Sequence, residues 1–317
     1  MSATLFAIGN LCIVILLGWW IANKSGGRLA GEFGPQFWGA LSKFVYFICV
    51  PCLLIAKLDT FRWDAEQGWF VLEAVVSIVA AQIFTIGLFH VLPFVREDKR
   101  TMQAITFQSN AVFLGFPLIE SILGKEGLDL AIIFAGISWP IVNAASIAVL
   151  IFGQAETSQA TGGWQRLLRD IWQKIRRDPI MLACVSGLIL SLVRWDLPSN
   201  VREVLMMVGG LTIPLALMIV GARMKLTNAA STRIQLLSIS IVKLILIPLV
   251  TWLVLLAFPI TDLQRNVLVL LASTPVAVSS VLMVEFYGGR KTLGANAVTI
   301  STVLSLLTIS AFAVLLI

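Results

Sequence analysis

Charged and metal-binding side chains are scarce in this sequence. Only 13% of its 317 residues are Asp, Glu, Lys or Arg, and it holds one His and four Cys. Soluble globular proteins carry about 25% charged residues, so the composition excludes a soluble enzyme domain, a disordered chain and a collagen-like chain. One His and four Cys are too few for a zinc or disulfide framework. We therefore expect no metal and no cofactor.

Apolar residues, in contrast, are unusually abundant. The hydrophobic set makes up 58% of the chain, and the mean hydropathy is +0.94. The net charge of +6 does not indicate a nucleic-acid partner, because basic residues in a chain this apolar are typical of the loops that orient a membrane protein. We predict an integral membrane protein whose surroundings are the lipid bilayer.

Ten segments are long and apolar enough to cross a bilayer, which takes about 20 residues each. They are 3–22, 36–57, 68–92, 101–123, 129–152, 179–196, 199–222, 232–258, 264–287 and 293–316. The first segment follows an uncharged N-terminus and is too long for the apolar region of a cleaved signal peptide. The sequence therefore predicts an all-α polytopic membrane protein with ten transmembrane helices.

The basic residues divide unequally between alternate loops. One set of loops holds 15 Lys and Arg residues and the other holds 6. Loops rich in Lys and Arg stay in the cytoplasm, so both termini should lie outside the cell or in the periplasm. We expect a multi-pass protein of the plasma membrane, which is the inner membrane in a bacterium.

The one long hydrophilic stretch, 153–178, divides the chain into two halves of five predicted spans, 1–152 and 179–317. Because five is odd, the second half enters the membrane from the opposite side. Such 5+5 inverted repeats are common among secondary transporters. Weak sequence matches between the halves recur at offsets of 163 and 165 residues.

The central stretch 153–178 has a helical pattern of its own. Trp164, Leu168 and Trp172 recur at helical spacing, with basic residues mostly on the other side. This pattern predicts a short amphipathic helix on the cytoplasmic leaflet. A solvated connector is the alternative.

Polar residues and prolines interrupt the fourth and ninth predicted spans, 101–123 and 264–287. Broken helices in a membrane are tolerated where they line a cavity, so we predict breaks near Gly115, Pro117 and Pro275. The alternative is two proline kinks with local side-chain repair. If the breaks form a site, the expected substrate-binding residues are Ser109, Asn110, Asn143, Thr274, Pro275, Ser279 and Ser280.

Three ionisable residues in or near the spans are candidates for coupling or gating, since such residues are costly in a membrane. Lys243 lies nearest the middle of a span and is expected to pair with a carboxylate or a backbone carbonyl. Glu120 and Glu285 fall near opposite faces of the membrane, where interfacial anchoring is the alternative.

The stretch Ser109-Asn-Ala-Val-Phe-Leu-Gly-Phe-Pro-Leu118 resembles the signature of the auxin efflux carrier family, which includes plant PIN-formed carriers and bacterial malonate and malate carriers. Segments such as Ile213–Ala222 and Thr274–Gly289 are similar to other recurring parts of that family. The resemblance implies interrupted fourth and ninth helices that cross, with Asn110 beside the ligand and Pro275 at the crossover. It also implies a scaffold of helices 1, 2, 6 and 7, through which members often dimerise, and a moving transport domain.

These observations predict a secondary transporter of a small organic anion, a mono- or dicarboxylate, that works by alternating access of elevator type. Two half-helix N-termini without neighbouring acids would favour a carboxylate. The alternatives are a sensor or channel on a transporter fold and an intramembrane enzyme. The enzyme is disfavoured because the one His closes a span and no Asp lies in a span except at its ends, which gives no catalytic constellation.

Overall fold

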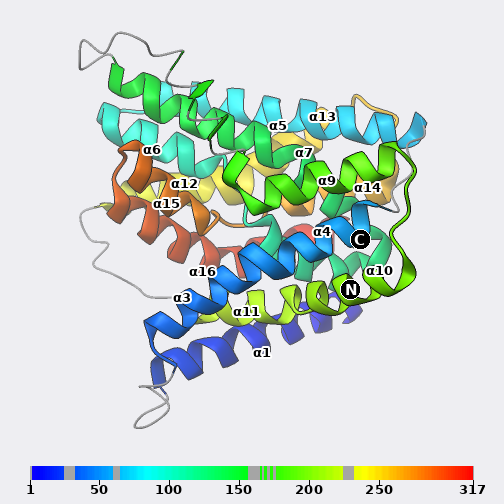
Figure 1. The fold of residues 1–317 in the computed structure, drawn as a ribbon. Helices are drawn as coiled ribbons and strands as arrows, with labels where there is room; N and C mark the ends of the chain where they lie inside the picture. Colours follow the sequence, from blue (N-terminus) through cyan, green and yellow to red (C-terminus); the bar gives the residue numbers. More distant parts are fainter. Residues whose placement is uncertain are drawn as a thin grey trace. The chain divides into compact units, whose positions relative to one another are not determined.

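The computed structural model describes residues 2–24, 33–59, 65–155, 165, 168–169, 172–173, 176–223 and 232–316. Over these residues the chain is all-helical, without strands apart from one isolated bridge, as predicted (Figure 1). The first half contains α1 (Ser2–Lys24), α3 (Pro35–Phe44), η1 (Val45–Cys49), α4 (Val50–Leu58), α5 (Ala65–Val91), α6 (Arg96–Thr106), η2 (Ala111–Gly115) and α7 (Phe116–Ala155). The second half contains α9 (Pro179–Leu192), α10 (Ser199–Gly210), α11 (Thr212–Ala222), α12 (Arg233–Ile241), η4 (Val242–Leu246), α13 (Ile247–Leu255), α14 (Asp262–Ala272), α15 (Ser279–Tyr287) and α16 (Lys291–Leu316).

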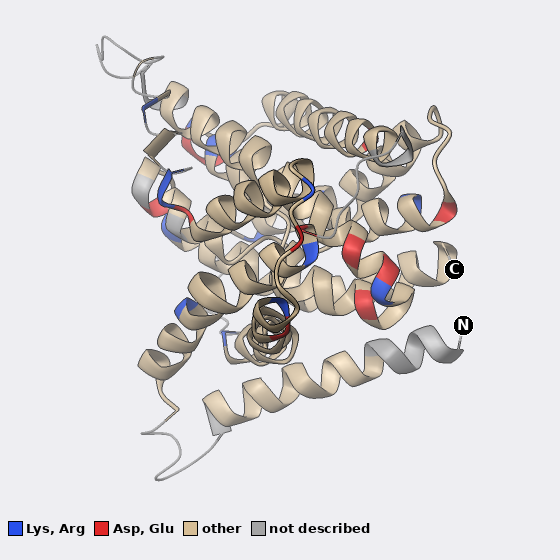
Figure 2. Cartoon of the chain, turned by 45° about the vertical axis from the view of Figure 1, so that its right-hand side comes forward, with Lys and Arg blue, Asp and Glu red and all other residues tan. Residues whose placement is uncertain are grey.

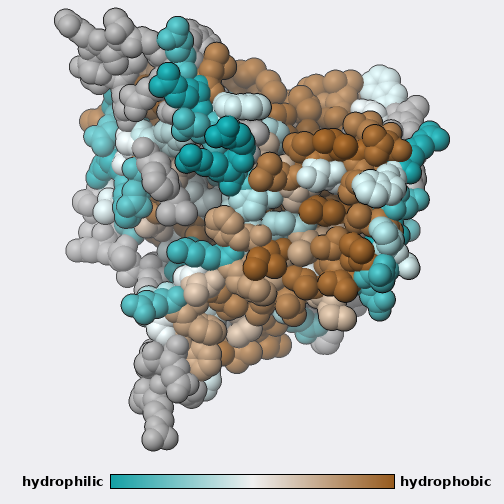
Figure 3. All heavy atoms as spheres, viewed as in Figure 1, coloured by the Kyte–Doolittle hydropathy of each residue, from teal (hydrophilic) through white to brown (hydrophobic). Residues whose placement is uncertain are grey.

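Six helical runs in the described part of the chain are long and apolar enough to cross a membrane. They are Pro35–Leu58, Gly68–Val91, Ala111–Phe152, Ser199–Ala222, Arg233–Leu255 and Lys291–Leu316, and shorter apolar helices cover Gly9–Ala22 and Pro179–Leu192. Few of their turns carry charge (Figure 2), and large apolar side chains gather on the visible surface (Figure 3). These features identify a membrane protein with several spanning helices.

Three segments of wider, π-type helix each end two residues before a proline. They are η1, η2 and η4, and the prolines are Pro51, Pro117 and Pro248. A proline has no N–H and its ring clashes with the carbonyl four residues earlier, so the preceding turn widens to relieve the clash. In η1, for example, the N–H of Val50 donates to the carbonyl of Val45, five residues back. The widened turns let these helices continue through their prolines.

The position of the first predicted break is corrected by this geometry. The helix is interrupted at 107–110, and it resumes at Ala111, so Gly115 and Pro117 lie inside the resumed helix. The loop expected between 123 and 129 is only a kink at Gly124, whose φ of 70° is the left-handed conformation that glycine tolerates. The second break is where Pro275 predicts it, since the chain is non-helical between α14 and α15.

Most of the predicted amphipathic helix within 153–178 lies outside the described residues. Of its apolar positions, Leu168 and Trp172 are described, and both are exposed.

The chain forms two compact units, each assembled from both halves of the sequence. Unit 1 comprises residues 1–69, 111–136 and 177–225, and unit 2 comprises 70–110, 137–176 and 226–317. Compact units and sequence repeats are different divisions of a chain, so the two predicted five-helix repeats, 1–152 and 179–317, stay a prediction.

Unit 1 is held by close contacts between helix backbones. A Cβ atom at Gly221 of α11 would lie 1.8 Å from the carbonyl oxygen of Ile15 in α1. A Cβ at Gly18 of α1 would lie 2.1 Å from the carbonyl oxygen of Met218. In lipid the hydrophobic effect does not drive helices together, so such close backbone packing supplies the contact energy instead.

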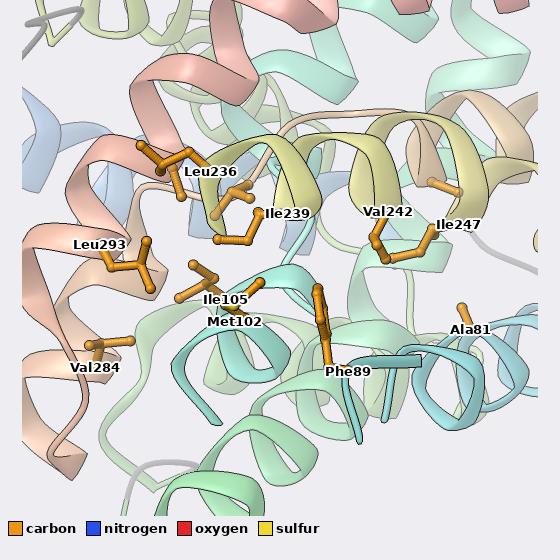
Figure 4. Packing of buried hydrophobic residues seen from close by; sticks show 13 residues of the cluster. Ala81, Phe89, Met102, Ile105, Leu236, Ile239, Val242, Ile247, Val284 and Leu293 are labelled. Carbon is orange, nitrogen blue, oxygen red and sulfur yellow. The ribbon is translucent and has the colours of Figure 1, made fainter. Parts of the chain in front are cut away.

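Unit 2 has an apolar core around α6 and α12 (Figure 4). Leu236 and Ile239 of α12 and Val242 of η4 recur three residues apart and so lie on one helical face. Met102 and Ile105 of α6 belong to the same buried cluster. This packing fixes the helix that leads into the first break against the helix that carries Lys243.

Candidate functional site

The two helix interruptions of unit 2 contact each other through their backbones. The N–H of Asn110 donates to the carbonyl of Pro275 at 2.9 Å, and the N–H of Ala277 donates to the carbonyl of Gln108 at 3.0 Å. Ser109 and Val276 face each other in an antiparallel bridge. We call this region, residues 107–110 and 273–278, the crossing. The hydrogen bonds of the crossing satisfy backbone N–H and C=O groups that would otherwise be unpaired at the ends of the broken helices, in apolar surroundings.

Hydroxyl side chains stabilise the end of α14 at the second interruption. Ser273 Oγ donates to the carbonyl of Leu270, and Thr274 Oγ1 donates to that of Leu271, both at 2.7 Å. Past Pro275, the N–H of Val276 donates to Ser301 Oγ at 3.2 Å. Local hydroxyl bonds of this kind compete with helix continuation, which explains why the chain leaves the helix here.

Gln108 connects the crossing to the neighbouring helices. Its Nε2 lies 3.4 Å from Ser146 Oγ and 3.5 Å from Asn143 Oδ1, both on α7. Its Oε1 accepts a hydrogen bond from Ser279 Oγ of α15 at 3.3 Å. Its Nε2 also lies 3.1 Å from Met283 Sδ of α15, so Gln108 is the centre of a buried polar network beside the crossing.

Asn110 holds a donor that nothing in the described chain uses. Its side chain is 2% exposed, and its Nδ2 is buried without a hydrogen-bond partner among the described residues. An unsatisfied buried donor costs about 1–3 kcal/mol, so such a group is retained where a ligand or water can bond to it.

Lys243 brings a positive charge to the crossing. Its side chain is 1% exposed. Its Nζ donates to Ser109 Oγ and, at 3.2 Å, to the carbonyl of Ala272. The predicted pairing with a backbone carbonyl is therefore present, and no carboxylate in the described part of the chain lies within ion-pair distance of it.

The N-terminus of α15 adds positive potential at the crossing, although the N–H groups of Ala277, Ser280 and Val281 donate to backbone carbonyls. Its N-cap residue, Val278, makes no side-chain capping bond, and its first turn contains no acidic residue. Helix N-termini carry about half a positive charge and point free N–H groups outward, which favours an anion.

The predicted site residues all belong to unit 2 and differ in their contacts. Four of them lie in the crossing itself: Ser109, Asn110, Thr274 and Pro275. Asn143 and Ser279 contact the crossing through Gln108. Ser280 donates to the backbone carbonyl of Ala277.

The other candidate residues are not part of the crossing. Glu285 forms an exposed ion pair with Lys291 at the start of α16. Glu120, Gly115 and Pro117 belong to unit 1.

Two polar residues that bond to this region, Ser146 and Ser301, were not among the predicted site residues. Ser146 is one helical turn from Asn143, so helical periodicity contained a signal for it. Ser301 bonds to the backbone of Val276 across 25 residues, and the sequence contains no local sign of that contact.

A family model described as a membrane transport protein matches residues 5–313. Among solved structures, the sodium proton antiporter MjNhaP1 from Methanocaldococcus jannaschii is similar, with a TM-score of 0.56 and 15% sequence identity. The likeness covers 96% of this chain and 90% of the antiporter chain. At that sequence identity, the similarity shows a related fold and nothing more. The sequence has no significant match among curated proteins.

Proposed function

Since the chain belongs to the membrane transport protein family, the auxin efflux carrier and PIN-like family, we propose that it is a secondary transporter of a small organic anion, a mono- or dicarboxylate. The observation that carries the proposal is the crossing in unit 2. It gathers a buried ammonium group, an unpartnered amide donor and a helix N-terminus, and none of the acids in the described chain is bonded to them.

The charge at the crossing favours an anion over a cation as the transported substrate. A transported cation needs oxygen ligands and a compensating negative charge, as carboxylates provide. The charged groups at this crossing are instead positive, and its free side-chain donor is the amide of Asn110. An anion would pair with both, and a carboxylate has two oxygens that accept such bonds.

The inverted repeat is supported by the bounds of the helices. Shifted by 165 residues, α5 covers 230–256, and α12, η4 and α13 together span 233–255. Shifted by 163 residues, α3 to α4 covers 198–221, and α10 to α11 span 199–222. The offset of 165 also relates Asn110 to Pro275, which hydrogen-bond to each other. We therefore propose ten crossings of the inner membrane in a 5+5 inverted repeat, with both termini outside.

An elevator movement agrees with the composition of the two units. Unit 1 contains α1, α3 to α4, α9 and α10 to α11, which correspond to predicted spans 1, 2, 6 and 7. It also contains residues 111–136, which belong to predicted spans 4 and 5. Unit 2 contains the crossing and most of predicted spans 3, 8, 9 and 10. In the proposed cycle unit 1 is a fixed scaffold, through which the protein forms a homodimer, and unit 2 carries the anion across the membrane.

Uptake by proteoliposomes tests the proposal. The purified full chain is reconstituted, and uptake of labelled acetate, lactate, malonate and succinate is measured at an acidic and a neutral pH. Saturable uptake above that of protein-free vesicles is expected for at least one carboxylate, and dependence on a pH gradient would indicate proton coupling. Binding without uptake would indicate a sensor, and uptake that does not saturate would indicate a channel.

A further inference from the structure

We infer that the Lys243 ammonium group binds the substrate carboxylate, and that Ser109 and the carbonyl of Ala272 hold this group only while no substrate is bound. The inference rests on the proposed function and goes beyond it. It assigns the charge-recognising residue of the site and limits the bound substrate to one negative charge at that position.

Lys243 occupies a core position of its helix. Leu236, Ile239, Lys243 and Ile247 follow one another at spacings of three or four residues and so lie on one face. All four are buried. A lysine on such a face cannot reach water by extending its side chain along the surface, unlike lysines near helix ends. Its ammonium group therefore stays inside unit 2.

The ammonium group lies between the two interruptions. Ser109 belongs to the first, and Ala272 is the last residue of α14 before the second. Lys243 Nζ donates to one group from each. A ligand bound to Nζ would consequently contact both broken helices at once.

The ligand-free contacts leave the charge of Lys243 unbalanced. Its two acceptors, a hydroxyl and a carbonyl oxygen, are neutral, and an ammonium group has three N–H donors. A buried charge without an opposite partner is costly, and an arriving carboxylate would remove that cost. Because the serine hydroxyl is a weaker acceptor than a carboxylate, the anion can displace it.

A second, independent observation points to a ligand at the crossing. The Nδ2 of Asn110, the residue after Ser109, is buried and has no partner in the described chain. An ammonium group and an amide N–H are both donors of the kind that carboxylate oxygens accept.

The basic residues that follow α15 do not contribute a second charge to the crossing. Arg290 pairs with the buried Asp98 at 2.6 Å, and Lys291 pairs with Glu285. Among the described residues, Lys243 is the positive side chain that bonds to the crossing, which favours a monocarboxylate, or a dicarboxylate whose second acid group is protonated.

A purely structural role for Lys243 predicts a different outcome. If the lysine only braces the two interruptions, its removal lowers stability and leaves the preference between charged and neutral ligands unchanged. The test therefore compares carboxylates with their neutral amides.

Ligand-induced thermal stabilisation of the purified full chain separates these roles. The probes are acetate, lactate, malonate and succinate, each with its amide: acetamide, lactamide, malonamide and succinamide. The variants are Lys243→Met, Lys243→Arg and Ser109→Ala. Lys43→Met is the matched control, because it removes a lysine from an exposed position of α3.

The wild type and Lys43→Met should bind at least one carboxylate and prefer it to its amide. Lys243→Met should bind that carboxylate at least tenfold more weakly and lose the preference over the amide. Lys243→Arg should keep part of the preference, and Ser109→Ala should bind the carboxylate more tightly than the wild type, because a competing acceptor is gone.

Equal carboxylate affinity in Lys243→Met and the wild type would overturn the inference and leave the proposed function intact. If Lys243→Met does not fold, a loss of the carboxylate preference in Ser109→Ala, which keeps the ammonium group, would overturn it too. Absence of carboxylate binding in the wild type would overturn both the inference and the proposed function.

Discussion

In unit 1 the buried carboxylates have partners, whereas unit 2 buries ionisable side chains that lack an oppositely charged partner. Asp59 in unit 1 is fully buried and accepts hydrogen bonds from Arg202 and from the N–H of Leu197. Asp178, also in unit 1, accepts from Tyr46 at 2.7 Å and caps the start of α9.

Unit 2 contains one buried pair of the same kind, between Asp98 and Arg290. It also buries Lys243 without a carboxylate, and both carboxyl oxygens of Glu73 without a hydrogen-bond partner among the described residues. Ionisable side chains buried in a membrane protein are costly, so they point to functional positions. The difference suggests that unit 1 is built for stability and unit 2 for binding.

The largest expected effect is loss of transport on changing Asn110 to Ala. The change removes the amide donor at the crossing but keeps the backbone N–H that bonds to Pro275. We expect uptake to fall by about 10–100-fold, because a lost hydrogen bond to a charged ligand costs about 1.5–3 kcal/mol. Uptake by proteoliposomes measures this loss of transport, and the melting temperature of the variant shows whether it is folded. Normal uptake at normal abundance would remove Asn110 from the site.

The next effect is on stability and concerns unit 1. Gly221→Ala would place a Cβ 1.8 Å from the Ile15 carbonyl oxygen, so α1 and α11 would have to separate. Overpacking of this kind costs about 3 kcal/mol, and we expect a clearly lower melting temperature in detergent. Gly9→Ala on α1 is the matched control, because a Cβ added there would have no neighbouring atom within 4 Å. Equal melting of the two variants would show that this helix contact does not hold unit 1 together.

A smaller loss of stability is expected for Asp59→Asn. The substitution keeps the shape of the side chain but removes the charge that Arg202 bonds at 2.6 Å, at a cost of about 1–3 kcal/mol. Asp262→Asn is the control, since its pair with Arg265 is exposed and such pairs contribute about 0–1 kcal/mol. Uptake per folded molecule should be unchanged in both variants. A defect in uptake without a loss of stability would contradict the proposed division between the units.

The sequence was sufficient for the helices and insufficient for the position of the first break. Apolar length predicted the run 199–222, which the structure reproduces as α10 to α11. Pro117 suggested a break that the helix avoids by widening the turn before it. The break lies at 107–110 instead, where Asn110 pairs with Pro275. That pairing joins residues 165 positions apart, and no local pattern contains it.

The same reason limits what the sequence says about Lys243. Its helical spacing places it on a buried face, which a reading of the sequence can find. Its contacts with Ser109 and Ala272 depend on how α6, α14 and η4 pack, and the absence of a nearby carboxylate in the described chain depends on that packing too. A position in the sequence can thus indicate a costly charge but not its partner.

Competition for uptake tests the central claim most directly. Uptake of the labelled carboxylate that proteoliposomes accumulate fastest is measured with an excess of unlabelled carboxylates, of their neutral amides and of organic cations. Unlabelled carboxylates should reduce the uptake, and the amides and cations should leave it unchanged, because the crossing offers a positive charge and hydrogen-bond donors. Competition by cations or neutral solutes alone would contradict the account.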